Sequence, residues 1–259
     1  MAEVTTHVPN TPGWIDIGTD VPAAKAFYCG LFGWSAADAG PPEETGGYGF
    51  FTTADGKHVA GYGPQQNPGP PFWSTYVIVP SAADVVDKVT AAGGQVVVPP
   101  MEVPAAGTFA VFTDAGGAFI SVWQPGQHTG AQVVREPGAF TWCELRSRDA
   151  AASKAFYASA FGWGAETMGA DAGMPYTEFK VDGESVAGMM EMTAEFPSEV
   201  PAHWLVYVEV ADTAASLAEA VSLGGSVQVP VVDFPGGQFA VIVDPQGAAF
   251  GIMTPSPQA

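Results

Sequence analysis

The chain has 259 residues, of which 47% are hydrophobic and 12% aromatic, so it can bury a substantial core and is not a disordered protein. Its formal net charge is −19, from 8 basic and 27 acidic residues. Nucleic acids and anionic membranes are bound through Lys and Arg, so this charge argues against both as partners. We interpret the acidic residues as a solubilising surface, with recruitment of a basic partner as the alternative.

Targeting signals and cysteines indicate the compartment. Residues 1–12 contain neither the basic stretch nor the apolar stretch of a secretion signal, and no apolar run approaches the ~18 residues that span a membrane. The two cysteines, Cys29 and Cys143, cannot form the disulfide framework of a small secreted protein. We therefore expect a cytoplasmic, reduced protein.

The chain contains an internal repeat. Residues 25–28 (Lys-Ala-Phe-Tyr) recur as residues 154–157, and residues 32–34 (Phe-Gly-Trp) recur as residues 161–163. Further pairs follow in the same order along both halves: Asp55-Gly56 with Asp182-Gly183, Trp73 with Trp204, Tyr76 with Tyr207, Gly93-Gly94 with Gly224-Gly225, and Asp114 with Asp244. This pattern indicates a duplication. We expect two domains, residues 1–124 and 139–259, joined by a linker rich in Pro and Gly over residues 125–138.

Each half is predicted to begin with a strand and a helix. In the first half the strand covers residues 14–19, and the helix begins near Pro22 and stops at Gly33, because glycine commonly follows a helix end. A hairpin turning at Asp55-Gly56 comes next. A strand over residues 72–79 and a helix over residues 82–92 then follow.

The last predicted elements of the first half are strands over residues 95–98, 109–113 and 118–123. The second half repeats the series: a strand over 142–147, a helix from Ala150 to Gly162, a hairpin at Asp182-Gly183, a strand over 204–210, a helix over 213–223, and a last strand over 248–253. Each half therefore carries two βαβββ units. The fold class is α+β, with tandem duplicated βαβββ modules forming curved mixed sheets around a cleft.

Three features of the chain resemble the vicinal oxygen chelate superfamily, also called the glyoxalase/bleomycin-resistance/dioxygenase superfamily. They are the βαβββ unit, the Phe-Tyr and Phe-Gly-Trp residues at the end of the first helix, and Asp-Pro-Gln-Gly at residues 244–247. The resemblance covers almost the entire chain and is greatest to actinobacterial tandem glyoxalase-like proteins, some of which carry the label hydroxylase. The superfamily includes isomerases, lyases, dioxygenases and drug-sequestering proteins, so the fold alone does not fix a function.

The resemblance implies a divalent metal held by His, Gln or Glu from three strands. The family motifs place these ligand positions at Trp14, Ser74 and Ser121 in the first half and at Trp142, Leu205 and Gly251 in the second. None of the six is a carboxylate or an imidazole. We therefore expect no metal at these positions, and we expect no cofactor.

The predicted strands instead carry large aromatic side chains, which favour a cavity for an aromatic or polycyclic ligand. The alternative is that these rings pack in the core. The candidate ligand-binding residues are Trp14, Trp73, Tyr76, Trp123, Trp142, Trp204, Tyr207 and Met253.

Three polar side chains are candidates for acid/base catalysis: the repeat-related carboxylates Asp16 and Glu144, and His203. We expect Glu144 to matter more than Asp16, because its apolar neighbours would raise the pKa of its carboxyl group. The alternative for both carboxylates is that they accept hydrogen bonds from backbone or tryptophan N–H groups. The other histidines, His7, His58 and His128, are expected outside the site.

The leading hypothesis is a protein that binds or transforms a hydrophobic, aromatic small metabolite without the family's metal site. An acid/base enzyme needs a polar group with a shifted pKa in the cavity, whereas a drug-sequestering binder needs only the aromatic cavity. The alternatives are a metal-dependent glyoxalase, lyase or dioxygenase, and a non-catalytic interaction protein. The chain is expected to be a monomer or a homodimer.

Overall fold

The computed structural model describes residues 3–66, 68–169, 175–194 and 196–256. The elements of the first half are β1 (Thr11–Thr19), α1 (Val21–Phe32), β2 (Ser35–Asp38), α2 (Pro42–Thr45), β3 (Gly49–Thr52), β4 (His58–Pro64), β5 (Phe72–Ile78), α3 (Ala82–Ala91), β6 (Gln95–Val103), β7 (Gly107–Thr113) and β8 (Phe119–Pro125). Those of the second half are β9 (Phe140–Ser147), α4 (Ala150–Phe161), β10 (Gly164–Met168), β11 (Tyr176–Val181), β12 (Glu184–Glu191), β13 (His203–Glu209), α5 (Thr213–Ser222), β14 (Ser226–Phe234), β15 (Gly237–Val243) and β16 (Ala249–Pro255).

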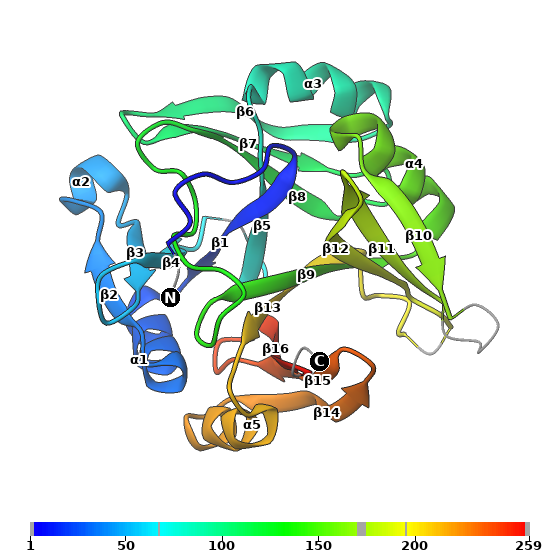
Figure 1. Ribbon diagram of the computed structural model, residues 1–259. Helices are drawn as coiled ribbons and strands as arrows, with labels where there is room; N and C mark the ends of the chain where they lie inside the picture. Colours follow the sequence, from blue (N-terminus) through cyan, green and yellow to red (C-terminus); the bar gives the residue numbers. More distant parts are fainter. Residues whose placement is uncertain (1–2, 67, 170–174, 195, 257–259) are drawn as a thin grey trace.

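The strands form two eight-stranded mixed sheets, one from each half (Figure 1). The order is β2-β3-β4-β1-β5-β8-β7-β6 in the first sheet and β10-β11-β12-β9-β13-β16-β15-β14 in the second. Equivalent strands occupy equivalent places, so the duplication and the predicted α+β class are confirmed. Neither sheet closes on itself, since β2 and β6, like β10 and β14, remain at opposite edges.

The first helix of each half ends at the glycine that the sequence indicated and begins after an aspartate that caps it. Before α1, the Asp20 carboxylate accepts the N–H of Ala23 at 3.1 Å, which satisfies a backbone donor that the helix itself leaves free. After α1, Gly33 adopts the left-handed conformation with φ 68°. Asp149 and Gly162 play the same parts at the ends of α4. The helix bounds follow from local chemistry that is repeated in both halves.

Some strands are longer than predicted, because their ends are set by pairing with a neighbouring strand and not by the local sequence. The predicted strand over residues 95–98 extends to Val103, because β6 pairs with β7 along its whole length through two irregularities in register. The first strand begins at Thr11, three residues before the predicted start, because Thr11 and Pro12 pair with the end of β5. Edge strands β2 and β10 had no predicted range.

One apolar core joins the two halves. Its buried residues come from both sheets and from the helices between them, and include Ile15 and Val77 of the first half with Leu145 and Val206 of the second. We call the face of each sheet that joins this core the inner face, and the opposite face the outer face. Because side chains alternate along a strand, each residue's face follows from its neighbours in the pairing register.

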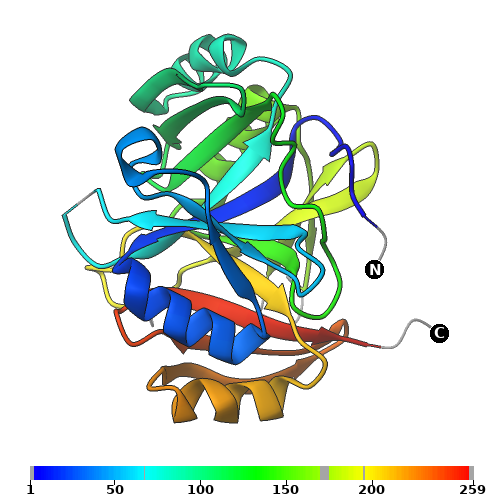
Figure 2. The ribbon, with the colours of Figure 1, turned by 90° about the vertical axis from the view of Figure 1, so that its left-hand side faces the viewer.

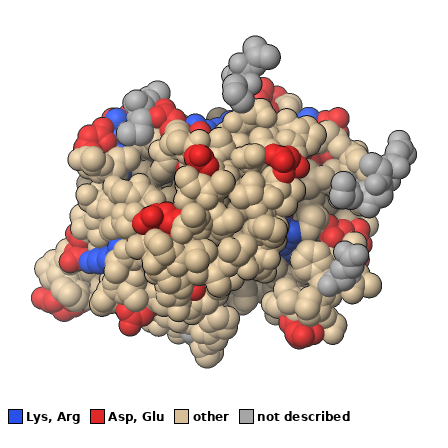
Figure 3. Space-filling view, turned by 90° about the horizontal axis from the view of Figure 1, so that it is seen from below, with Lys and Arg blue, Asp and Glu red and all other residues tan. Residues whose placement is uncertain are grey.

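The helices pair across the halves. Helix α1 packs beside α5, and α3 packs beside α4, as Figures 1 and 2 show. Among these described helices none combines the length and the apolar composition that crossing a membrane requires. Acidic side chains are scattered over the face in Figure 3, in agreement with the net charge of −19.

A reciprocal hydrogen-bond chain connects the halves. The Tyr28 hydroxyl donates to Asp244 at 2.8 Å and accepts the indole N–H of Trp73 at 3.0 Å. The repeat-related chain runs the other way, from Trp204 through the Tyr157 hydroxyl to Asp114. All these groups are buried, so each hydroxyl satisfies two polar groups that would otherwise lack partners. Tyr28, Tyr157 and Asp244 belong to the motifs that carried the family resemblance. They therefore connect the two halves through these hydrogen bonds.

Candidate functional site

The outer face of the second sheet carries a buried ion pair. Nε of Arg146 lies 2.7 Å from Oε1 of Glu144, and both side chains are about nine-tenths buried, with exposed fractions of 11% and 9%. The contact is an ion pair without the alignment of a hydrogen bond. Arg146 also donates to the Tyr207 hydroxyl at 3.3 Å. Tyr176 and Tyr207 hydrogen-bond Glu144, and Trp142 donates its indole N–H to Tyr176 at 3.0 Å.

Burial and charge act in opposite directions on Glu144. Burial raises the pKa of its carboxyl group above the ordinary range, while the Arg146 guanidinium and the two tyrosine hydroxyls lower it. The upward direction agrees with the sequence argument. The cationic partner was not anticipated, although the alternation Trp142-x-Glu144-x-Arg146 places all three side chains on one face and could have indicated it.

A small apolar cluster adjoins the ion pair and is separate from the main core. It is built on buried Leu205, Tyr207 and Val241, and partly buried side chains complete it: Trp142, Val229, Phe239, Ala249 and Met253. Gly251 belongs to the same face, and a side chain there would overlap the Tyr207 ring, whose Cδ1 lies 2.2 Å from the Cβ position. The glycine is therefore required by the close approach of a ring.

The first sheet has an equivalent arrangement without a cation. The Asp16 carboxylate accepts hydrogen bonds from the Tyr48 hydroxyl at 3.1 Å and the Tyr76 hydroxyl at 2.9 Å, and Trp14 donates its indole N–H to Tyr48. Burial raises the pKa of Asp16, against the hydrogen bonds from the tyrosines and Ser74. The position of Arg146 is taken here by Gly18. Tyr48 and Tyr176, which sequence reasoning missed, complete the two carboxylate sites.

The segment between the sheets covers the first outer face. The His128 ring lies edge-on to Trp14 with ring centres 4.5 Å apart, and Trp123 donates its indole N–H to the His128 carbonyl at 2.8 Å. As a result Trp14 is only 2% exposed, whereas its counterpart Trp142 is partly exposed. The two carboxylate sites thus differ in access as well as in charge.

Trp73 and Trp204 were predicted in the ligand site, and the structure places them elsewhere. Each lies on the inner face, is at most 6% exposed, and bonds to the tyrosine of its own first helix. The reason is alternation: Trp73 and Tyr76 are three residues apart on one strand, so their side chains point to opposite faces. Of the predicted set, Trp14, Tyr76, Trp123, Trp142, Tyr207 and Met253 lie on the outer faces.

His203 lies on the outer face of the second sheet, opposite Arg146 in the pairing of β13 with β9. Its Nδ1 is 2.9 Å from the Pro201 carbonyl oxygen. Burial lowers the pKa of the imidazole, and Arg146 and Arg148 lower it further. His203 and Glu144 therefore share a face, while Asp16 belongs to the other sheet.

The resemblance assigned metal ligands to six positions on the outer faces, and the structure shows whether the residues there could bind a metal ion. The indole N–H groups of Trp14 and Trp142 are used in hydrogen bonds to tyrosines, Leu205 is apolar, and Gly251 has no side chain. Among the six residues, only Ser74 and Ser121 have a side-chain oxygen atom that could bind a metal ion. The described residues contain no cluster of three or more His, Cys, Asp or Glu suited to a metal ion. These side chains do not fit the family's metal site.

Two cavities are described by their lining residues, and neither of these two has the indole or phenol wall that the sequence led us to expect. One, of about 370 Å³, lies between the N-terminal segment and the second half and includes Thr6, Phe140 and Val186. The other, of about 290 Å³, lies beside His58 and His128. Neither of these two cavities is lined by Trp14, Trp142 or Tyr207.

Comparisons with known proteins agree on a family and a fold. Residues 17–122 and 139–252 match the family described as the glyoxalase/bleomycin resistance protein/dioxygenase superfamily. A protein of Mycobacterium bovis named "Putative glyoxylase CFP32" is 40% identical, with both chains covered completely. An "Anthracycline biosynthesis protein DauV" of Streptomyces sp. (strain C5) is 36% identical, over 96% of this chain and 95% of that protein.

Solved structures share the fold at low identity. The 2,3-dioxygenase LapB of Pseudomonas sp. KL28 has a TM-score of 0.66 at 12% identity, covering 98% of this chain and 95% of that chain. The Mn(II)-bound glyoxalase of Novosphingobium aromaticivorans has a TM-score of 0.64 at 15% identity, covering 95% of this chain and 82% of that chain.

Proposed function

Because the chain belongs to the glyoxalase/bleomycin resistance protein/dioxygenase superfamily, we propose that it binds a flat, hydrophobic small molecule on the outer face of its second sheet, without the family's metal ligands. The observation that carries this proposal is the buried pair of Glu144 and Arg146 beside the partly buried Trp142, Phe239 and Met253. Apolar surface next to a few fixed polar groups is the usual composition of a small-molecule site.

Stability does not explain the ion pair. Removing two charges from water is costly, and well-packed apolar residues in place of a buried pair are often as stable or more stable. Arg146 is held by Glu144 and Tyr207, and its Nη1 lies 3.4 Å from the Met190 sulfur. A guanidinium fixed in this way next to aromatic surface is suited to anchor an oxygen atom of a ligand that stacks on the apolar cluster.

The names of two relatives support the class of ligand. Both Streptomyces relatives, 36% and 35% identical, are named as anthracycline biosynthesis proteins. Anthracyclines are flat polycyclic molecules with oxygen atoms at their edges, a combination that would complement the apolar cluster and the guanidinium of this face. We therefore place polycyclic aromatic metabolites first among the candidate ligands.

The surroundings of Glu144 favour a role in ligand binding over a role in proton transfer. Arg146 opposes the effect of burial on its carboxyl group, so Glu144 serves as the partner that orients the guanidinium. Asp16 has no ion pair among the described residues, and burial raises its pKa. Proton transfer at Asp16 is therefore the second candidate function, and it requires that the segment around His128 move to admit a substrate.

The test is binding of an anthracycline aglycone, followed by quenching of tryptophan fluorescence. Phe239→Ala should weaken binding about tenfold, the equivalent of about 1.4 kcal/mol of aromatic contact. The matched control is Phe109→Ala, at the equivalent position of the first half. Equal losses in both variants, or none in either, would contradict the assignment to the second outer face.

A second variant separates anchoring from acid/base chemistry. Glu144→Gln preserves size but cannot carry a proton, and it leaves Arg146 without its counter-ion. If Glu144 orients Arg146, the variant should bind the aglycone several-fold more weakly at every pH from 5 to 8. If affinity and any turnover are unchanged, Glu144 has neither role.

A further inference from the structure

Three of the four histidines of the chain come together at one corner of the first half, away from the site proposed above. They are His7, before β1, His58, at the start of β4, and His128, in the segment between the sheets. The ring centres of His58 and His128 are 5.8 Å apart. Sequence reasoning expected all three outside the functional site.

The rings of His58 and His128 are positioned by contacts with other aromatic rings. The His58 ring stacks on Phe50 at 4.1 Å, with the planes 4° apart, and the His128 ring packs edge-on against Trp14. Within the described residues, Nε2 of His128 is buried and has no hydrogen-bond partner. A buried polar atom without a partner is uncommon and calls for a physical explanation.

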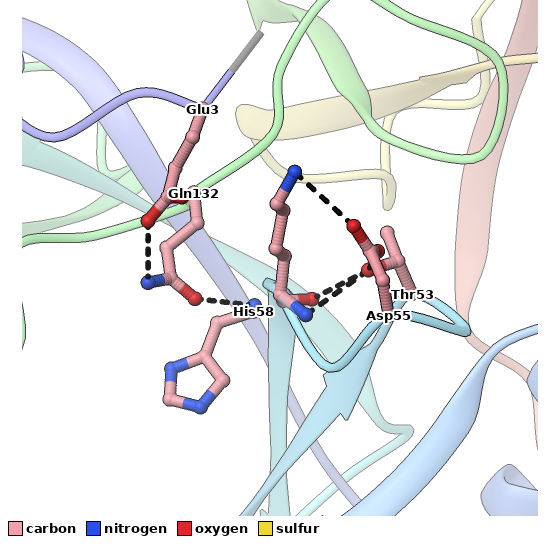
Figure 4. Close-up of polar contacts among 6 residues, drawn as sticks. Glu3, Thr53, Asp55, His58 and Gln132 are labelled. Carbon is pink, nitrogen blue, oxygen red and sulfur yellow. Dashed lines mark hydrogen bonds and ion pairs between the residues drawn. The ribbon is translucent and has the colours of Figure 1, made fainter. Parts of the chain in front are cut away.

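The backbone around His58 is held separately from its ring. Figure 4 shows that the Gln132 side chain accepts the His58 backbone N–H at 2.8 Å and donates to Glu3 at 3.4 Å, while the imidazole makes no polar contact with the residues drawn. His7 is different, because its Nε2 already bonds to the Ala131 carbonyl at 2.9 Å. His58 and His128 are therefore the two imidazoles of the three for which the described residues show no hydrogen bond at the ring nitrogens.

Both imidazoles border the same cavity of about 290 Å³. Its wall is completed by small side chains and polar groups of Ala105, Ala106, Gln127 and Gln132. Burial lowers the pKa of His58, and burial together with the neighbouring His58 and His7 lowers that of His128 to about 4.

We propose that His58 and His128 together bind a first-row transition-metal dication at the wall of this cavity. A metal–nitrogen bond of about 2 Å places the ion about 3 Å from the ring centre, so two imidazoles that share an ion have centres up to about 6 Å apart. The observed 5.8 Å lies within that reach. Imidazole suits Zn²⁺, Ni²⁺ and Cu²⁺, and Cu²⁺ binds most strongly in this series. Such an ion would fasten the segment around His128 to β4.

The experiment is titration of the full-length protein with Cu²⁺ alone, followed by electron paramagnetic resonance. The wild type should show one site with coupling to two imidazole nitrogens. His58→Phe and His128→Phe retain a ring in each place but remove the nitrogen ligands. Each should weaken binding by at least about tenfold, since disturbing even the supporting residues of a metal site costs 10–100-fold. The control is His203→Phe, which should bind as the wild type does.

Two further readouts make the result decisive. Bound metal should raise the unfolding temperature of the wild type but not that of either site variant, because a ligand of the native state stabilises it. If His128→Phe fails to fold, His58→Phe decides alone, since that ring is half-buried and its backbone is held by Gln132. Binding that survives in the double variant, or is lost only in His203→Phe or His7→Phe, would overturn the proposal. Neither result bears on the aglycone site of the second sheet.

Discussion

At the scale of single residues, the two repeat-related carboxylates show how duplication is followed by divergence. Asp16 and Glu144 have tyrosine partners at equivalent positions of the two halves, but of the two carboxylates only Glu144 forms an ion pair among the described residues. The charged form of Glu144 is thereby stabilised, while that of Asp16 is stabilised by hydrogen bonds from Tyr76, Tyr48 and Ser74. The sequence argument ranked Glu144 above Asp16 as an acid/base group, and this ranking stays a prediction: burial raises the pKa of both carboxyl groups, and Glu144 has in addition a cation that opposes the rise.

A pH-dependent stability measurement tests the electrostatics of Asp16. Because its folded pKa is raised, the folded protein holds the proton more tightly than the unfolded chain does. Its contribution is therefore fully present below the unfolded pKa and is lost as the pH rises through the folded pKa. Asp16→Asn removes this loss. The free energy of unfolding of the variant, relative to that of the wild type, should therefore increase as the pH rises from about 4 to 7.

Urea unfolding at several pH values provides the measurement, and an exposed carboxylate provides the control. The pKa of Asp38 is lowered by its hydrogen bond with Lys25, so Asp38→Asn should lose stability relative to the wild type as the pH rises, the opposite sign. Parallel pH profiles for Asp16→Asn and the wild type would show that Asp16 has the same pKa folded and unfolded.

At the scale of elements, the first helix of each half supplies the tyrosine that holds the opposite half. Tyr28 on α1 reaches Asp244 before β16, and Tyr157 on α4 reaches Asp114 before β8. The aspartates also accept backbone N–H groups of their own turns, such as that of Ala118. One buried tyrosine hydroxyl thus connects a helix and a strand of the first half with a turn of the second, and another makes the equivalent connection from the second half to the first.

Removing either tyrosine hydroxyl should therefore cost nearly the same stability. Tyr28→Phe and Tyr157→Phe each leave a tryptophan N–H and an aspartate oxygen without a partner, which costs about 1–3 kcal/mol. Urea unfolding at pH 7 measures the loss. The control is Tyr62→Phe, whose hydroxyl bonds to exposed Asp38, and it should cost less than about 1 kcal/mol. A large difference between Tyr28→Phe and Tyr157→Phe would contradict the reciprocal arrangement.

At the scale of the whole molecule, the two halves share one core. Phe27 of α1 packs against Phe250 of β16, and Trp163 donates its indole N–H to the carbonyl of Asn10. Trp34 makes the reciprocal bond to the carbonyl of Gly138. A half on its own would expose the inner faces of its helices to water, at a cost of about 25 cal/mol per Å² of apolar surface.

We accordingly predict that residues 1–138 and 139–259 do not fold cooperatively when produced separately. Each piece should bind a hydrophobic dye and unfold without a sharp transition, whereas the two pieces produced together should associate and regain a single transition. Circular dichroism and urea unfolding check this. A monomeric half with a sharp transition of its own would contradict the shared core.

Much of the fold could be predicted because it depends on local chemistry. The repeat, the helix end at Gly33 and the turns at Asp-Gly pairs are determined by neighbouring residues, and they were sufficient for an α+β duplication. Alternation along a strand also placed Asp16 with Trp14 on one face. The same rule, applied to Trp73 and Tyr76, would have separated two residues that were assigned to one site.

The sequence by itself thus determined the repeated units, their order and the alternation of side chains within each strand. Only the tertiary structure decided which side faces the shared core, that the segment containing His128 covers Trp14, and that His58 and His128 meet at one cavity. The reason is physical: local propensity acts over a few residues, whereas these contacts join positions about 70 to 110 residues apart and depend on how the sheets pack.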